Sequence, residues 1–230
     1  QIPEFALLTP LIVMSFIMAI ATFLVYLFLP NRPMSSNIDT KREKIVLDKN
    51  LKILISIGVI IFTAFALVQS ITAYYVQDRF DVSLDETAKT TALLLGTMAF
   101  MAIISQLTFV QKYKGNPLNL IKFSLPLFIL SCLSIIFSPN FLFLYLGMAL
   151  MGLGMGLASP GYTSAASLNA DKDNQGAAVG LAMIAPGIGF ALGPFISGFL
   201  YSISMNLPFI FILPLFMLLA ILIKRLEQLI

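Results

Sequence analysis

Residues 180–198 read GLAMIAPGIGFALGPFISG and contain five glycines and two prolines in nineteen positions. In a helix surrounded by water, each interior glycine costs about 1 kcal/mol relative to alanine and each proline about 3 kcal/mol, or roughly 11 kcal/mol for this stretch. In lipid the backbone has few alternatives to a helix, because every polar backbone group needs a partner within the protein. We therefore interpret this stretch as a bent helix that crosses a membrane.

The rest of the chain is equally apolar. Hydrophobic residues make up 59% of its 230 residues and charged residues 11%, against roughly 45–50% and 25% in a soluble domain. Seven apolar runs can each cross about 30 Å of hydrocarbon as a helix, and none alternates like a membrane β-strand. The class is therefore all-α integral membrane. The runs are 5–29, 53–76, 92–111, 119–138, 141–163, 175–201 and 207–223.

Lysine and arginine are divided unequally between alternate loops. Twelve of the fourteen lie in 30–52, near 112–122, near 171–173 or after the last run, whereas the alternate loops hold only Arg79 and Lys89. These residues concentrate on the cytoplasmic side of membrane proteins. We therefore predict a cytoplasmic C-terminus and an outward N-terminus, and the net charge of +3 gives no indication of nucleic-acid binding.

Residues that carry chemistry are scarce. The chain has no histidine and one cysteine, Cys132, and its charged residues all lie in loops or at the ends of the apolar runs. An intramembrane protease needs a Ser/His pair, two carboxylates or a metal site. We therefore expect no enzyme, no metal and no cofactor. A proton relay also lacks a carboxylate within these spans, and Glu4 at a span boundary is the nearest candidate.

Two polar segments separate the spans in an informative way. Residues 30–50 have the mixed charges, prolines and serines of a solvated linker, and they separate one span from six. Because a single leading helix has no evident partner, we expect the chain to begin partway through a longer protein. In the outer loop, Ser83 and Glu86 have the spacing of a capping box that starts the next helix, and a gate or ligand vestibule is the alternative.

Glycines four residues apart occur on two spans, where they allow another backbone to approach closely. Pro186 and Pro194 also free backbone carbonyls and bend the helix that contains them. Two interpretations stay open, namely tight packing alone and packing with a bent helix beside a pathway. The glycine pairs are Gly152 with Gly156, Gly176 with Gly180, and Gly189 with Gly193.

Two sets of residues are candidates for a substrate cavity. One stripe on 53–76 is aromatic at one end and hydrogen-bonding at the other, and it consists of Phe62, Phe65, Gln69 and Thr72. Methionines at helical spacings would provide a flexible apolar surface, and they are Met98, Met101, Met148, Met151 and Met155. The alternatives are an ordinary bundle core for the methionines and interhelical hydrogen bonding for Gln69.

The opening stretch is similar to the antiporter motif of the major facilitator superfamily, G-x8-G-x3-G-P-x2-G-G. Ser197 replaces one glycine of the motif, and the matching residues are Gly180, Gly189, Gly193, Pro194 and Gly198. Residues 74–88 and 174–201 resemble the regions of helices seven and eleven in the twelve-helix drug:proton antiporter branch. The loop 106–120 departs from the family pattern, because it lacks the Asp and Arg of the second basic motif.

The resemblance implies that 1–29 is helix six, 30–52 the central cytoplasmic loop and 53–230 the complete C-terminal six-helix bundle of a twelve-helix fold. Its partner would be the N-terminal half of the same transporter. The implied function is alternating access with proton-coupled export of a small amphiphilic drug or metabolite. The implied location is the plasma membrane, which is the inner membrane in a bacterium. Uptake, and a membrane sensor or assembly partner that does not transport, remain alternatives.

Overall fold

The computed structural model describes residues 4–28, 49–168 and 175–229, and their regular structure is helical. Two compact units are present, Gln1–Lys44 and Ile45–Ile230. The first contributes α1 (Glu4–Phe28), a helix of 25 residues. The second contains α2 (Lys49–Phe80), α3 (Leu84–Thr108), the short 3₁₀ helix η1 (Val110–Lys112), α4 (Pro117–Ile136), α5 (Phe141–Leu168), α6 (Gln175–Ala182), α7 (Ile184–Ile203) and α8 (Leu207–Glu227).

The all-α membrane class predicted from the sequence is confirmed. Six helical segments of the second unit are long and apolar enough to cross a membrane, and α1 is a further apolar helix. The run predicted at 175–201 is divided at Met183 into α6 and α7. α2 begins at Lys49, so the last residues of the predicted linker 30–52 are helical, because the buried Leu51 already faces the core. The remainder of that linker lies outside the described residues.

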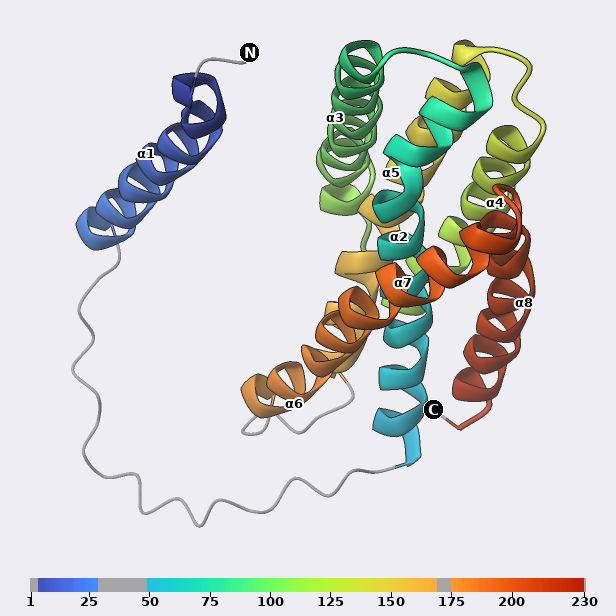
Figure 1. The fold of residues 1–230 in the computed structure, drawn as a ribbon. Helices are drawn as coiled ribbons and strands as arrows, with labels where there is room; N and C mark the ends of the chain where they lie inside the picture. Colours follow the sequence, from blue (N-terminus) through green and yellow to red (C-terminus); the bar gives the residue numbers. More distant parts are fainter. Residues whose placement is uncertain (1–3, 29–48, 169–174, 230) are drawn as a thin grey trace. The chain divides into compact units, whose positions relative to one another are not determined.

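In the second unit, α2 and α5 occupy the centre (Figure 1). α7 lies along α2 and α3 lies along α5, while α4 packs on α5 and α8 packs against both α2 and α4. When α2–α4 are taken as one half of the unit and α5–α8 as the other, each central helix therefore has a neighbour from the other half.

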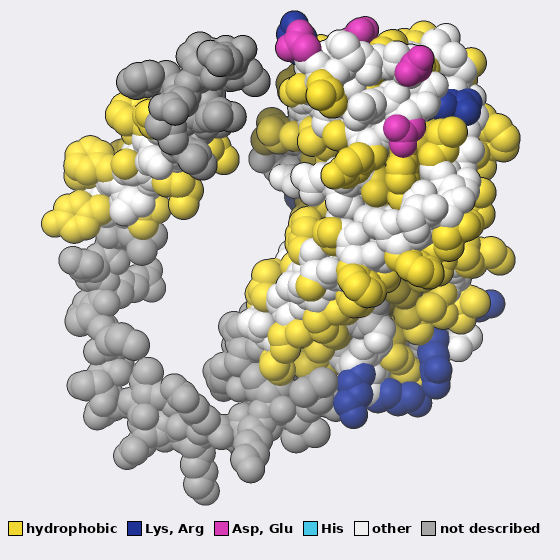
Figure 2. Space-filling view, viewed as in Figure 1, with side chains coloured by type: hydrophobic (Ala, Val, Ile, Leu, Met, Phe, Trp, Pro, Cys, Tyr) yellow, Lys and Arg dark blue, Asp and Glu magenta, His cyan; other side chains and the backbone are white. Residues whose placement is uncertain are grey.

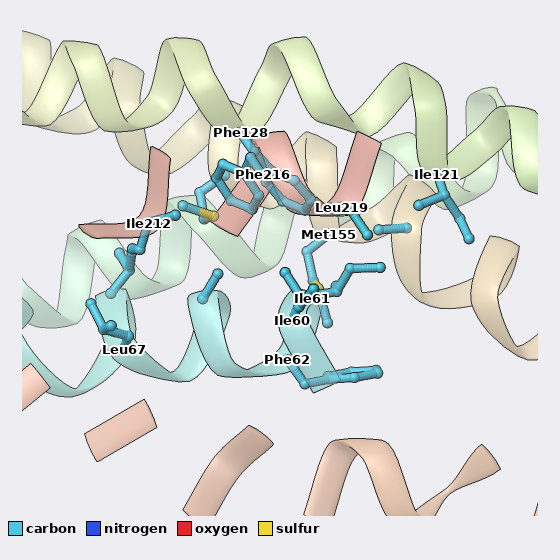
Figure 3. Packing of buried hydrophobic residues seen from close by; sticks show 14 of the residues in the cluster. Ile60, Ile61, Phe62, Leu67, Ile121, Phe128, Met155, Ile212, Phe216 and Leu219 are labelled. Atoms are coloured by element: carbon cyan, nitrogen blue, oxygen red, sulfur yellow. The ribbon is translucent and has the colours of Figure 1, made fainter. Parts of the chain in front are cut away.

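The core of this unit is almost entirely apolar. Phe128 of α4 and Phe216 of α8 stack with ring centroids 5.0 Å apart and planes within 10°. Figure 3 shows Met155 beside Ile61 of α2 in the same cluster. Because these side chains exclude both water and lipid, they hold α2, α4, α5 and α8 at fixed spacings.

The turn between α2 and α3 contains the cap that the sequence predicts. The backbone N–H of Glu86 donates to the hydroxyl of Ser83 at 3.3 Å, and Ser83 has the extended conformation of an N-cap residue. Asp81 reverses the chain with a φ of 49°, a left-handed conformation that Asp tolerates. The capping role predicted for Ser83 is therefore confirmed.

Candidate functional site at the contact of α2 and α7

α7 packs on α2 in a constant parallel register. Contacts recur at five successive helical turns, and the two members of each pair are 127 residues apart in the sequence. Side chains four residues apart share one face of a helix, so a constant offset means that one face of α7 follows one face of α2. We call this contact the α2–α7 seam, and its pairs are Gly58 with Ala185, Phe62 with Gly189, Ala66 with Gly193, Ser70 with Ser197, and Tyr74 with Tyr201.

Two glycines bring the helices into backbone contact at the middle of the seam. A Cβ on Gly189 would lie 2.5 Å from the Cβ of Phe62 and 2.8 Å from its carbonyl carbon. A Cβ on Gly193 would lie 2.6 Å from the Cβ of Ala66 and 2.8 Å from the backbone nitrogen of Leu67. Since backbone cannot move aside as a side-chain tip can, both positions require glycine.

Polar contacts continue the seam toward the end of α2 that leads into the α2–α3 turn. The hydroxyls of Ser70 and Ser197 are 2.8 Å apart and form a hydrogen bond between the two helices. One turn further, the rings of Tyr74 and Tyr201 lie 6.3 Å apart, and the Tyr201 hydroxyl donates to Asp78 at 2.7 Å. The seam therefore changes from apolar backbone contact to hydrogen bonds as it approaches the α2–α3 turn.

The break between α6 and α7 is satisfied by a side chain of α5. Pro186 has no N–H, so the carbonyl of Ala182 loses its helical donor. The buried hydroxyl of Tyr162 donates to this carbonyl at 2.7 Å. Gly58 makes the arrangement possible, because a Cβ there would lie 2.5 Å from the Cζ of Tyr162. The neighbouring helix thus replaces the hydrogen bond that the proline removes.

Phenylalanines of both helices meet on one side of the seam. The ring of Phe190 on α7 lies 6.2 Å from each of the rings of Phe62 and Phe65 on α2. Phe62 is buried, Phe65 is half-buried, and 46% of Phe190 is exposed. Gln69, one turn beyond Phe65, is exposed. These residues form a partly exposed aromatic surface with an amide at one end.

The other cavity candidates occupy different surroundings. Thr72 is buried, and its hydroxyl donates to the carbonyl of Val68 on its own helix. Met98, Met148, Met151 and Met155 lie in the hydrophobic core, whereas Met101 is half-buried. The structure therefore brings Phe62, Phe65 and Gln69 together near α7 and does not bring the methionines to that surface.

Glycines of α5 form a second close contact, with α3. A Cβ on Gly156 would lie 2.5 Å from the carbonyl oxygen of Ala102. A Cβ on Gly152 would overlap the carbonyl oxygen of Met98. The hydroxyl of Ser105 donates across this contact to the carbonyl of Leu153 at 3.1 Å. The glycine pair predicted to permit close helix approach does so here.

Comparison with protein-family models gives a match over nearly the whole chain. The model of the Major Facilitator Superfamily matches residues 7–184 and, in a second overlapping alignment, residues 109–228. The chain belongs to the Major Facilitator Superfamily. No curated protein matches it.

Members of this superfamily are membrane transporters, so this chain is part or all of one. The four glycines of the antiporter-like motif lie in two different environments in this structure. Gly189 and Gly193 lie in the seam, whereas nothing lies within 4 Å of a Cβ on Gly180 or Gly198. Ser197, which replaces a motif glycine, supplies the hydroxyl that bonds Ser70. The motif is therefore a packing surface over part of its length.

The loop that lacks the superfamily's basic motif is held by aromatic rings. The rings of Phe109, Tyr113 and Phe123 contact one another pairwise with centroids 6.2–6.3 Å apart. Asn116 then caps α4 by accepting from the N–H of Leu118 at 2.9 Å. Apolar contacts thus order a loop in which the motif's Asp and Arg are missing.

Three residues at the site were not predicted from the sequence. Phe190, Tyr162 and Ser70 become prominent only once the helices are placed. The sequence could have indicated Phe190, because it lies within the glycine-rich stretch 180–198, directly after Gly189. No local pattern marks Tyr162 or Ser70.

Proposed function

We propose that this transporter works by alternating access, and that the chain supplies the sixth helix and the C-terminal half of a twelve-helix fold. The superfamily match and the two close parallel helix contacts, α2 with α7 and α3 with α5, support this assignment. Each central helix of the second unit also packs against a helix from the other of the two segments α2–α4 and α5–α8, as would be expected if these segments are two nested repeats.

The transport reaction we propose is proton-coupled export of a small amphiphilic molecule, as in the drug:proton antiporter branch. The observation that carries the proposal is the antiporter-like spacing at 180–198, whose two central glycines touch α2. The described spans have charged residues only near their ends, so the coupling carboxylate is expected in the N-terminal half.

Phe65, Gln69 and Phe190 are the residues proposed to contact substrate. Phe65 and Phe190 present aromatic surface from two helices, and Gln69 adds a donor and an acceptor at its edge. A mostly apolar surface with one polar group is suited to an amphiphilic molecule. Met101 on α3 is a further candidate, because it is half-buried rather than enclosed in the core.

The proposed orientation places the α2–α3 turn outside and the C-terminus in the cytoplasm, in the plasma membrane. Figure 2 shows Asp and Glu side chains at the end of the second unit that holds the α2–α3 turn and most of the visible Lys and Arg side chains at the other end, where Glu227 forms an ion pair with Lys122. The basic end includes Lys52, Lys224 and Arg225. This separation is the one expected of a helix bundle with its basic end toward the cytoplasm.

The test is flux in reconstituted vesicles. The full-length protein is inserted into liposomes, a pH gradient is imposed, and the movement of fluorescent amphiphilic dyes and candidate metabolites is followed with and without a protonophore. We expect flux in the export direction that the protonophore abolishes. Flux that persists without the gradient would remove proton coupling. Equilibrium binding without flux would favour a sensor or assembly partner.

A further inference from the structure

Basic residues from two distant segments lie at one end of the second unit. The connection between α3 and α4 carries two lysines, and the last turn of α8 carries a lysine and an arginine. Both segments lie at the same end, because Lys122 near the start of α4 forms an ion pair with Glu227 at the end of α8. We call the four residues the basic patch, and they are Lys112, Lys114, Lys224 and Arg225.

The charge of the basic patch is not neutralised within the described part of the second unit. Its four residues are exposed, and none of them forms an ion pair with a described residue. Glu227 is the one acidic residue described at this end, and it is already paired with Lys122. The C-terminal dipole of α8 supplies only about half a negative charge. Four positive charges with so little compensation attract an anionic partner.

Three aromatic rings lie beside the lysines of the α3–α4 connection. The rings of Phe109 and Tyr113 stack within 15° of parallel, and the ring of Phe123 is nearly perpendicular to both, at 82° and 89°. This cluster is only partly covered, since 49% of Phe109 and 47% of Phe123 is exposed. Lys112 and Lys114 flank Tyr113 in the sequence, so positive charges and exposed rings occur together at this end.

The combination of rings and charges favours a lipid over an anion dissolved in water. Aromatic side chains of membrane proteins gather at the level of the lipid headgroups. The α3–α4 connection joins two apolar spans, Leu84–Lys112 and Pro117–Ile136, so its rings lie near that level. A dissolved anion such as inorganic phosphate would contact the lysines but would gain nothing from exposed phenylalanine. A phospholipid contacts both kinds of side chain.

We propose that the basic patch binds the phosphate groups of anionic phospholipids, whose upper acyl chains lie against Phe109 and Phe123. In the proposed orientation these lipids belong to the cytoplasmic leaflet. Lipids bound along both segments add to the contact that Lys122 and Glu227 make between α4 and α8, so they stabilise the folded protein. Lipid binding at this end is separate from the proposed transport function and requires no flux.

The test is lipid binding to the full-length transporter in detergent. The protein is freed of lipid and titrated with anionic phosphatidylglycerol or zwitterionic phosphatidylcholine, and bound lipid is measured by native mass spectrometry and by thermal unfolding. The double variants Lys112→Gln/Lys114→Gln and Lys224→Gln/Arg225→Gln each remove half of the basic patch and change only exposed residues. Lys89→Gln is the matched control, because Lys89 is an exposed lysine near the start of α3, at the opposite end of that helix from the patch.

We expect phosphatidylglycerol to bind and to raise the unfolding midpoint, and phosphatidylcholine to do so far less. Each basic residue near an anionic surface contributes roughly fivefold in affinity, so each double variant should bind phosphatidylglycerol about 25-fold more weakly. Lys89→Gln should bind it as the wild type does.

Three results would overturn lipid binding by the basic patch. They are an affinity that both double variants keep, an equal loss of affinity in Lys89→Gln, and an equal rise of the unfolding midpoint with inorganic phosphate in place of the lipid. None of these measurements depends on flux, so absence of transport in vesicles would count against the proposed transport function alone.

Discussion

The hydroxyl of Tyr162 donates a hydrogen bond of 2.7 Å to the carbonyl of Ala182, which Pro186 leaves without a helical donor. A proline inside a membrane helix is tolerated when a neighbouring helix satisfies the carbonyl that it frees. Tyr75 donates a hydrogen bond of 2.9 Å to the carbonyl of Ile135 at the end of α4, which also accepts from the backbone N–H of Ser138. Tyrosine hydroxyls from neighbouring helices therefore bond to a carbonyl at the α6–α7 interruption and to another at the end of α4.

Replacing Tyr162 with phenylalanine should leave the Ala182 carbonyl buried without its donor. We expect Tyr162→Phe to lower the free energy of unfolding by about 1–2 kcal/mol, since hydrogen bonds between membrane helices contribute about 0.6 and at most about 1.7 kcal/mol and an unpaired buried acceptor costs more. Thermal unfolding in detergent measures the change. Tyr145→Phe on the same helix is the control, because Tyr145 is half-buried and α5 retains the Tyr162 bond. Equal midpoints for the two variants would contradict the prediction.

Gly58→Ala should act through the same hydrogen bond. Its Cβ would lie 2.5 Å from the Cζ of Tyr162, so the ring must move and its hydroxyl must leave Ala182. We expect Gly58→Ala to destabilise the protein, and we expect the double variant with Tyr162→Phe to be less destabilised than the sum of the two single variants. Unfolding midpoints of all three variants test this coupling. Strict additivity would show that Gly58 acts independently of the hydrogen bond.

The motif glycines should differ in their tolerance of a side chain. We expect Gly193→Ala to destabilise the protein by about 1–3 kcal/mol, because its Cβ would meet Ala66 and the backbone of Leu67. Gly189→Val and Gly193→Val should abolish transport while membrane insertion persists. Gly198→Ala is the matched control, since nothing lies within 4 Å of its Cβ and alanine favours a helix by about 1 kcal/mol. Thermal unfolding and vesicle flux are measured together, and destabilisation by Gly198→Ala alone would refute the assigned contacts.

The cavity candidates should separate into core residues and substrate contacts. Met151 is completely buried, so Met151→Ala should cost about 2–5 kcal/mol of stability. Gln69 is exposed, so Gln69→Ala should change stability by less than about 0.5 kcal/mol and raise the KM for transport. Unfolding midpoints and flux at several substrate concentrations distinguish the two effects. An unchanged KM for Gln69→Ala would remove this residue from the proposed substrate surface.

The membrane orientation can be tested with single cysteines at exposed ends. Asp85 at the start of α3 and Gln228 after α8 are both exposed, whereas Cys132 is buried. We expect a membrane-impermeant thiol reagent to label Asp85→Cys in intact cells and to label Gln228→Cys only after permeabilisation. The reverse pattern would overturn the proposed topology.

The sequence predicted the helical class and the approximate positions of the apolar helices because hydrophobic length is a local property of the chain. It also predicted the cap at Ser83. It predicted that glycines would allow close helix approach, as Gly152, Gly156, Gly189 and Gly193 do, but it did not predict which helices they meet. The methionine stripes show the limit of such reasoning. A stripe at helical spacing has the same appearance whether it faces a core or a cavity, and the fold places most of these side chains in the core.

By itself, the sequence of this protein determined that it spans a membrane as apolar helices and that one span is rich in glycine and contains two prolines. The tertiary structure decided which helix those glycines meet, that Tyr162 satisfies the carbonyl freed by Pro186, and that Ser197 bonds Ser70. The reason is physical: each of these contacts joins residues far apart in the chain, and their partners are fixed only when two rigid helices are brought together in one register.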